Sequence, residues 1–143
     1  GAHSIQVPLK DDETHDLSAM LDALTPETRV IFICSPNNPT GQIVNRDDLE
    51  EFIRQVPVEV VIVLDEAYIE YVPEEKRSDS FRLYREHSNV VILRTFSKAY
   101  GLAGLRVGFS ISQEPITQAL RKTAMPFGVS SLAQAAAIAS IHV

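Results

Sequence analysis

Lys98 lies in a setting that favours covalent chemistry. It follows an apolar segment closely, and Phe96 and Tyr100 lie two residues away on either side. Burial among such side chains, together with a neighbouring cation such as Arg106, would favour the neutral amine, which is the form that attacks a carbonyl to make a Schiff base. A surface lysine that extends its ammonium into solvent is the alternative interpretation, and Lys98 alone does not decide between the two.

Asp65 is the second candidate for chemistry, because it directly follows the apolar run VVIVL. A carboxylate at such a position is costly to desolvate unless a cation meets it. A protonated pyridine nitrogen would be such a cation, and the carboxylate would keep that ring protonated and electron-withdrawing. A helix cap or a structural salt bridge would explain Asp65 equally well.

Polar side chains beside the apolar runs complete the candidate site. Asn38 and Tyr68 can each donate a hydrogen bond to a phenolate oxygen, although the segment NNPTG around Asn38 is also a good turn sequence. Two hydroxyls and a guanidinium could bind a phosphate, and these belong to Thr95, Ser97 and Arg106. The glycines of the sequence match neither a P-loop nor the Gly-x-Gly-x-x-Gly fingerprint.

Together these residues supply an amine, a partner for a ring nitrogen, two donors to a phenolate and a phosphate-binding group. Pyridoxal 5′-phosphate is the common cofactor that needs this whole set. The sequence therefore predicts Lys98 as the catalytic residue. The predicted cofactor-binding residues are Asn38, Asp65, Tyr68, Thr95, Ser97, Lys98 and Arg106.

The candidate residues follow three apolar, β-branched runs, at Val30–Cys34, 60–64 and 90–93. The two intervals between these runs are 25 residues each, which is enough for a loop, a helix and a return. Parallel strands need crossovers of this kind, and open α/β sheets bind ligands beyond the carboxyl ends of their strands. We therefore predict a three-layer αβα fold with a mostly parallel sheet, in which the strand ends bring the candidate residues together.

Further elements flank the three central strands. Apolar periodicity and capping residues predict helices after Asp16, after Asn45, around residues 79–87, from Pro115 and over Ser131–Ile141. Two more strands are predicted, at residues 5–9 and 106–111. Because the helices number only four or five, part of one face of the apolar sheet is expected to stay uncovered.

The composition is that of an ordinary globular protein, with 45% hydrophobic and 22% charged residues and a net charge of −6. The basic residues are dispersed, which argues against a nucleic-acid partner, and no apolar stretch is long enough to suggest a membrane span. The single cysteine, Cys34, excludes an intramolecular disulfide. Neither Cys34 nor the histidines, His142 included, show metal-ligand spacing. We expect no metal site and a cytoplasmic location.

Three segments carry these residues: SPNNPTG at 35–41, LDEAYIEY at 64–71 and LRTFSKAYGLAGLRVGF at 93–109. In order and spacing they resemble the aspartate-aminotransferase superfamily of pyridoxal-phosphate enzymes, and within it most of all the histidinol-phosphate aminotransferases. The resemblance implies that Lys98 forms the Schiff base with the cofactor and that Asp65 pairs with the pyridine nitrogen. It also implies that Tyr68 and Asn38 contact the ring oxygen, and that the phosphate is bound by Thr95, Ser97 and Arg106.

The resemblance implies a reaction as well. An amino acid or amine would displace Lys98, whose freed amine would then move a proton between the donor carbon and the cofactor. The amino group would pass to a 2-oxo acid in a ping-pong cycle. The residues of the second and third segments resemble those of histidinol-phosphate aminotransferases, which favours amino transfer from histidinol phosphate to 2-oxoglutarate, as in histidine biosynthesis.

Members of this superfamily are considerably longer than 143 residues. The resemblance therefore implies that residues 1–143 are the central part of the cofactor-binding large domain of a type I fold. The beginning of that domain and the small domain with the arginine that binds the substrate carboxylate would lie outside it. We expect the full-length protein to be a homodimer and this segment alone to be inactive.

Other functions stay open at this point. An aromatic or broad-specificity aminotransferase, or a decarboxylase acting on an amino-acid phosphate, would share the same three segments. A non-catalytic relic of the fold is a different class, but it would have no physical reason to keep a desolvated lysine and aspartate together. A Schiff-base aldolase would not need both a ring-nitrogen carboxylate and a phosphate-binding group.

Overall fold

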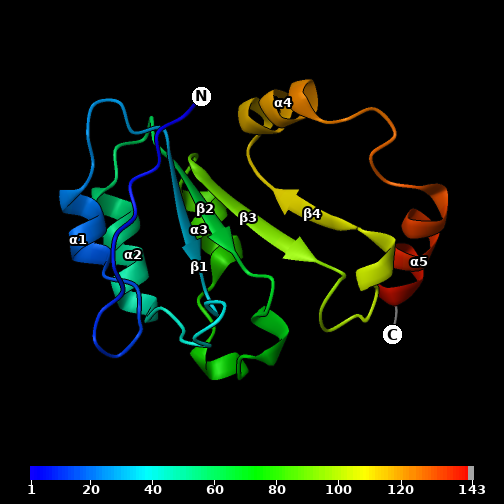
Figure 1. The fold of residues 1–143 in the computed structure, drawn as a ribbon, viewed down its shortest axis with the longest axis horizontal. Helices are drawn as coiled ribbons and strands as arrows, with labels where there is room; N and C mark the ends of the chain where they lie inside the picture. Colours follow the sequence, from blue (N-terminus) through cyan, green and yellow to red (C-terminus); the bar gives the residue numbers. More distant parts are fainter. Residues whose placement is uncertain (142–143) are drawn as a thin grey trace.

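One four-stranded sheet organises the chain (Figure 1), in a computed structural model that describes residues 1–141. Its strands are β1 (Val30–Cys34), β2 (Val61–Asp65), β3 (Val90–Thr95) and β4 (Gly108–Ile111), and they lie side by side in that order. The first three strands are parallel, and β4 runs antiparallel to β3. This arrangement confirms the predicted α/β fold with a mostly parallel sheet. His142 lies outside the described residues.

Three helices cover one face of the sheet. They are α1 (Leu17–Asp22), α2 (Arg46–Gln55) and α3 (Ser80–Glu86), close to the helices predicted after Asp16, after Asn45 and at 79–87. Alternate residues of the strands point into this layer, and each fully buried side chain of this kind contributes about 1.5–3 kcal/mol. The core includes Leu17, Ile31, Ile33, Leu49, Phe52, Ile53, Ile62, Leu64, Leu83 and Val90.

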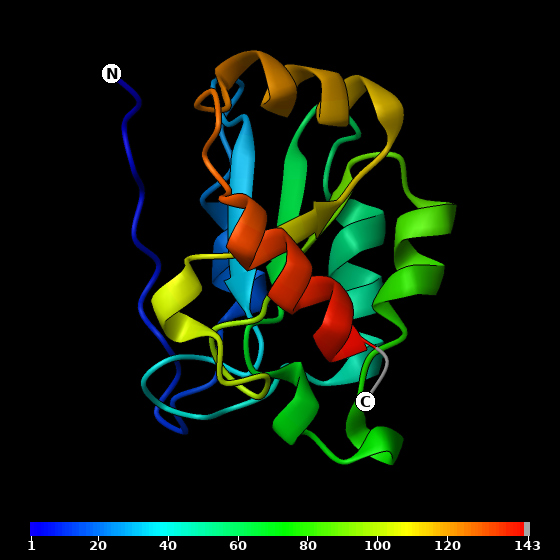
Figure 2. The ribbon, with the colours of Figure 1, turned by 90° about the vertical axis from the view of Figure 1, so that its right-hand side faces the viewer.

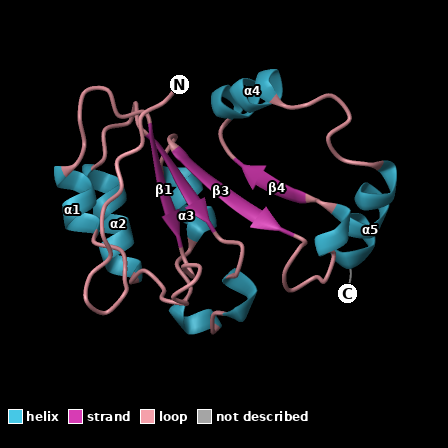
Figure 3. Ribbon diagram, in the orientation of Figure 1, coloured by secondary structure: helices cyan, strands magenta, loops and turns pink. Residues whose placement is uncertain are grey.

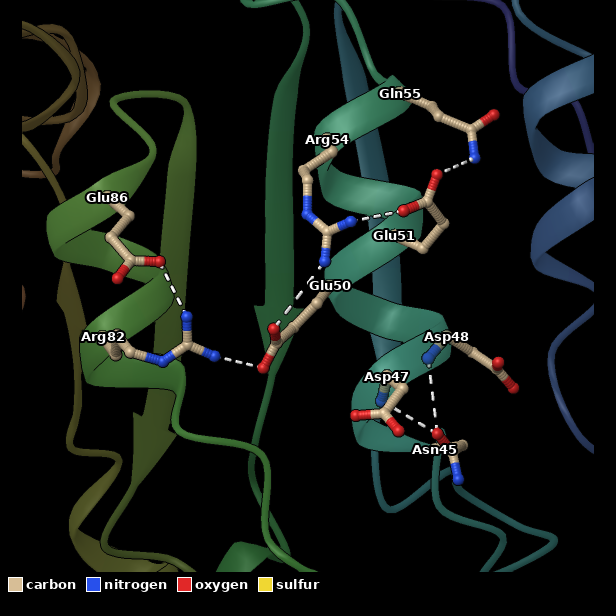
Figure 4. Close-up of polar contacts among 9 residues, drawn as sticks. All are labelled: Asn45, Asp47, Asp48, Glu50, Glu51, Arg54, Gln55, Arg82 and Glu86. Carbon is tan, nitrogen blue, oxygen red and sulfur yellow. Dashed lines mark hydrogen bonds and ion pairs between the residues drawn. The ribbon is translucent and has the colours of Figure 1, made fainter.

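The amino end of α2 is capped by Asn45, as predicted. Its side-chain oxygen accepts the backbone N–H groups of Asp47 at 2.8 Å and Asp48 at 3.3 Å (Figure 4). Replacing Asn45 with alanine in the full-length protein should lower the free energy of unfolding by about 1 kcal/mol, because both donors lose their partner. Urea unfolding measures the loss. Asn45→Asp keeps an acceptor oxygen, and an equal loss in that variant would contradict the explanation.

The opposite face of the sheet is only partly covered. On β1, Val30 and Phe32 are 47% and 66% exposed. Helix α5 (Ser131–Ile141) contacts the connection between β3 and β4 through Ala133 and Ala137 (Figure 2). Helix α4 (Glu114–Thr123) has Pro115 in its first turn, as predicted, and buries none of its residues. The expectation of a partly uncovered face is therefore confirmed.

Two predicted strands differ from the structure. Residues 5–9 form no strand among the described residues; Pro8 lacks an N–H to donate to a sheet, and Ile5 is 62% exposed. The strand predicted at 106–111 begins only at Gly108, because Arg106 has a left-handed backbone with φ of 51°. Gly108 is needed there, since a Cβ atom would lie 2.8 Å from the carbonyl oxygen of Arg94 on β3.

Short 3-10 turns link the main elements. They are η1 (Ile69–Tyr71), η2 (Glu74–Lys76) and η3 (Ala103–Leu105). Within residues 1–141 no helix combines the length and apolar character that crossing a bilayer requires. The same residues contain no cluster of three or more side chains arranged to hold a metal ion.

Candidate active site

The predicted site residues lie at, or just beyond, the carboxyl ends of β1, β2 and β3, where the strand arrows run into loops (Figure 3). Cys34 pairs with Asp65, and Asp65 pairs with Leu93, so the three strands end nearly level. Side chains alternate along a strand, and Leu64 contacts the layer of α1, α2 and α3. Asp65 therefore belongs to the opposite, partly uncovered face of the sheet.

A hydrogen bond joins the ends of β1 and β2. The side-chain amide of Asn38 donates to the Tyr68 hydroxyl at 3.1 Å. Because the Tyr68 oxygen accepts this bond, its own proton remains available to donate elsewhere. Asn38 and Tyr68 were predicted to serve the same ligand oxygen from different strand ends, and the fold brings them into direct contact.

A second contact joins the ends of β2 and β3. The Lys98 ammonium lies over the Tyr68 ring, with Nζ 5.1 Å from the ring centroid. Lys98 itself is exposed, so the expectation that Phe96 and Tyr100 bury it is wrong for the described chain. Phe96 turns inward and contacts Tyr100 and Phe109 instead, at centroid distances of 5.0 Å and 5.6 Å. Tyr68 is thus the aromatic partner of the lysine.

The main chain holds Asp65 firmly at the end of β2. Its carbonyl oxygen accepts the N–H of Ser35 at 3.0 Å, and its Oδ1 accepts the N–H of Ala67 at 3.1 Å. These bonds fix both the backbone and the side chain of the aspartate. The interpretation as a structural salt bridge finds no support within residues 1–141, since the ion pairs found there do not include Asp65.

Two of the three predicted phosphate-binding residues are neighbours. The Thr95 hydroxyl oxygen accepts the N–H of Ser97 at 3.1 Å. Arg106 is brought near them by the backbone, because the N–H of Phe96 donates to the carbonyl of Val107 at 3.2 Å. The Arg106 guanidinium is exposed and donates to the carbonyl of Ala103 at 2.8 Å. Its part in phosphate binding stays a prediction.

Two further features lie around the site. Cys34 is half-buried, and burial raises the pKa of its thiol, which fits the expectation of an unreactive side chain. An open pocket beside Asn38 and Tyr68 is also lined by Tyr71 and Lys76, among others. Lys98 is not part of its lining, so this pocket adjoins the predicted site and does not contain it.

Sequence reasoning missed one pair of charged residues. Asp65 and Leu93 are paired in register, and the residues that directly follow them are Glu66 and Arg94. Both Nε and Nη2 of the Arg94 guanidinium contact the Glu66 carboxylate at 2.7 Å. Burial raises the pKa of Glu66, and the attraction of Arg94 offsets this only in part. Opposite charges at adjacent strand ends were the signal that could have revealed the pair.

Comparison with known proteins identifies the family of the chain. Residues 1–142 match the family model described as aminotransferase class I and II. The chain belongs to this family. Aromatic amino acid aminotransferases of Streptomyces coelicolor and Streptomyces avermitilis are 61% and 60% identical over 142 residues, which is 99% of this chain and 40% of each relative. The chain therefore spans about two-fifths of the length of these curated relatives.

A solved structure of the aminotransferase fold agrees with this assignment. Histidinol-phosphate aminotransferase from Sinorhizobium meliloti, in complex with pyridoxal-5′-phosphate, is 37% identical to the chain, with a TM-score of 0.87. The match covers 96% of this chain and 37% of that protein. The predicted superfamily is thereby confirmed.

Proposed function

We propose that this chain is the central part of the cofactor-binding domain of a pyridoxal-phosphate-dependent aminotransferase. The observation that carries the proposal is the pair of contacts at Tyr68, which receives the Asn38 amide on its hydroxyl and the Lys98 ammonium over its ring. Residues from three separate strand ends thus meet around one tyrosine. Membership of the family, and the cofactor in the Sinorhizobium meliloti enzyme, support the proposal.

The residues present fit pyridoxal phosphate. Asp65 offers a carboxylate for the ring nitrogen, and Tyr68 has a hydroxyl proton that its bond with Asn38 leaves available. Thr95 offers a hydroxyl for the phosphate group, and its bond to the N–H of Ser97 keeps Ser97, the second hydroxyl-bearing residue, beside it. When bound, this cofactor withdraws electrons from the carbon that carries the amino group.

Each residue then has a definite task in the proposed reaction. Lys98 would hold the cofactor through its Nζ atom and, once displaced by the amino donor, would carry a proton at that same atom to and from the donor carbon. Asp65 would keep the ring nitrogen protonated. Tyr68 and Asn38 would hold the ring oxygen by hydrogen bonds, so that the ring cannot rotate away from Lys98.

Two amino donors follow from the comparisons. Relatives at 60–61% identity are named aromatic amino acid aminotransferases, which favours an aromatic amino acid paired with a 2-oxo acid. The structural likeness to a histidinol-phosphate aminotransferase at 37% identity keeps histidinol phosphate as the second candidate. A homodimer and a cytoplasmic location stay predictions for the full-length protein.

Labelling of the full-length protein tests this function. After incubation with pyridoxal phosphate and reduction with borohydride, the modified peptide should contain Lys98. An adduct at another lysine, or no adduct, would overturn the assignment. A panel of phenylalanine, tyrosine and histidinol phosphate with 2-oxoglutarate then decides between the two donors, and turnover by the isolated 143 residues would contradict the proposal that they are only part of the enzyme.

A further inference from the structure

A buried ion pair lies directly behind the candidate site. The Glu66 side chain is only 6% exposed and the Arg94 side chain 21% exposed, and two guanidinium nitrogens contact the same carboxylate oxygen at 2.7 Å. The guanidinium also lies over the Phe81 ring of α3, with Cζ 5.4 Å from the ring centroid. The reaction proposed above uses neither charge.

Such a pair is poorly explained by stability alone. Removing two charges from water is costly, and buried ion pairs often contribute little more than apolar residues of the same size. Burial indeed raises the pKa of Glu66 despite its partner. The neighbours of Arg94 instead fix the orientation of its guanidinium, which has a carboxylate on one side and an aromatic face on the other.

The pair connects the two strand ends that carry the proposed chemistry. Glu66 follows Asp65 at the end of β2, and Lys98 comes shortly after Arg94 on the segment that leaves β3. The N–H of Glu66 also donates to the carbonyl of Leu93 at 3.0 Å, so main chain and side chain are fastened at the same place. Any shift of one strand end along the other must break this connection.

The side chains at these strand ends point in alternate directions. Asp65 belongs to the partly uncovered face, whereas Glu66 lies on the side of α3, where the guanidinium of its partner Arg94 lies over Phe81. The ion pair can therefore connect the two strand ends on the α3 side of the sheet, without occupying space that a ligand would need on the opposite face.

From this geometry we propose that Glu66 and Arg94 are positioning residues, which set the separation between the Asp65 carboxylate and the Lys98 amine. The proposal rests on the proposed function, because Asp65 and Lys98 must both contact one cofactor ring. A displacement of about 1 Å between groups of this kind can lower a rate by about a hundredfold, so a rigid connection between the two strand ends matters.

The variant Glu66→Gln in the full-length protein tests the proposal, because it keeps the size of the side chain and removes its charge. We expect the dissociation constant for pyridoxal phosphate to rise by about tenfold or more. We also expect the visible circular dichroism of the bound cofactor, normalised to cofactor content, to fall, because this signal reports how the ring is held. Arg94→Lys keeps a cation opposite Glu66 but loses the second nitrogen contact and the planar group over Phe81, so both properties should fall between those of Glu66→Gln and the unmodified protein.

Glu50→Gln is the matched control. Glu50 on α2 is also partly buried and contacts Arg82 of α3, so this pair joins two helices and not two strand ends (Figure 4). The control variant should bind the cofactor as the unmodified protein does, even where thermal unfolding shows lower stability.

The outcomes separate this proposal from the proposed function. Cofactor affinity and dichroism unchanged in folded Glu66→Gln would overturn the positioning role. An Arg94→Lys variant with unchanged cofactor affinity and dichroism would overturn it too, and this second variant decides the question if Glu66→Gln does not fold. Failure of the unmodified protein to form a Lys98 adduct would overturn the proposed function itself.

Discussion

Replacing Lys98 with alanine in the full-length protein should lower kcat/KM for amino transfer by about a thousandfold or more, since proton transfer by a positioned group alone contributes about a hundredfold to ten-thousandfold. In the proposed reaction the variant loses both the covalent link to the cofactor and the amine that moves the proton. Because the Lys98 side chain is exposed and its ammonium lies over the Tyr68 ring without being buried, the free energy of unfolding should hardly change. Steady-state kinetics with the preferred amino donor measures the loss.

Two controls make the Lys98 result specific. Lys122→Ala removes an exposed lysine from α4 and should leave the rate unchanged. A small primary amine added to Lys98→Ala should restore part of the activity, because it supplies the missing base. A Lys98→Ala enzyme that retains the full rate would exclude Lys98 as the catalytic residue.

Asp65→Asn should lower kcat/KM by about a hundredfold or more. In the proposed site the carboxylate pairs with the ring nitrogen, and leaving one partner of an ion pair enclosed by a bound ligand unmatched costs about 3–5 kcal/mol, where each 1.36 kcal/mol is tenfold in rate. An amide at this position cannot hold the proton on the ring nitrogen. Asparagine keeps an oxygen that can accept the N–H of Ala67, so the local fold should persist. The loss should therefore appear in the rate and not in the unfolding temperature.

The pH dependence of cofactor absorbance in Asp65→Asn gives an independent measurement. Loss of the carboxylate should alter the spectrum of the bound cofactor. The variant Asp65→Glu keeps the charge, so its spectrum should lie between those of Asp65→Asn and the unmodified protein. If Asp65→Asn matches the unmodified protein in rate and spectrum, Asp65 does not pair with the ring nitrogen. The carboxylate would then serve only to hold the turn that follows β2.

Several elements of the fold could be predicted because their causes are local. Asn45 and Asp16 cap helices through oxygens that reach backbone groups two or three residues away, and apolar spacing marks the buried faces. The strand runs and their equal intervals implied parallel pairing, which the register of β1, β2 and β3 confirms. Residues 5–9 show the limit, because a short apolar segment by itself does not provide a strand with a partner.

The sequence by itself determined the family, the parallel direction of the three central strands and the placement of the candidate residues after strand ends, because capping, periodicity and motif spacing act over short stretches of chain. Only the tertiary structure decided that Tyr68 contacts both Asn38 and Lys98, that Lys98 is exposed, and that Glu66 meets Arg94. These contacts join residues about 30 positions apart. They exist because strand register and the alternation of side chains across the sheet bring distant residues to one edge, and no local preference of the chain specifies which of them touch.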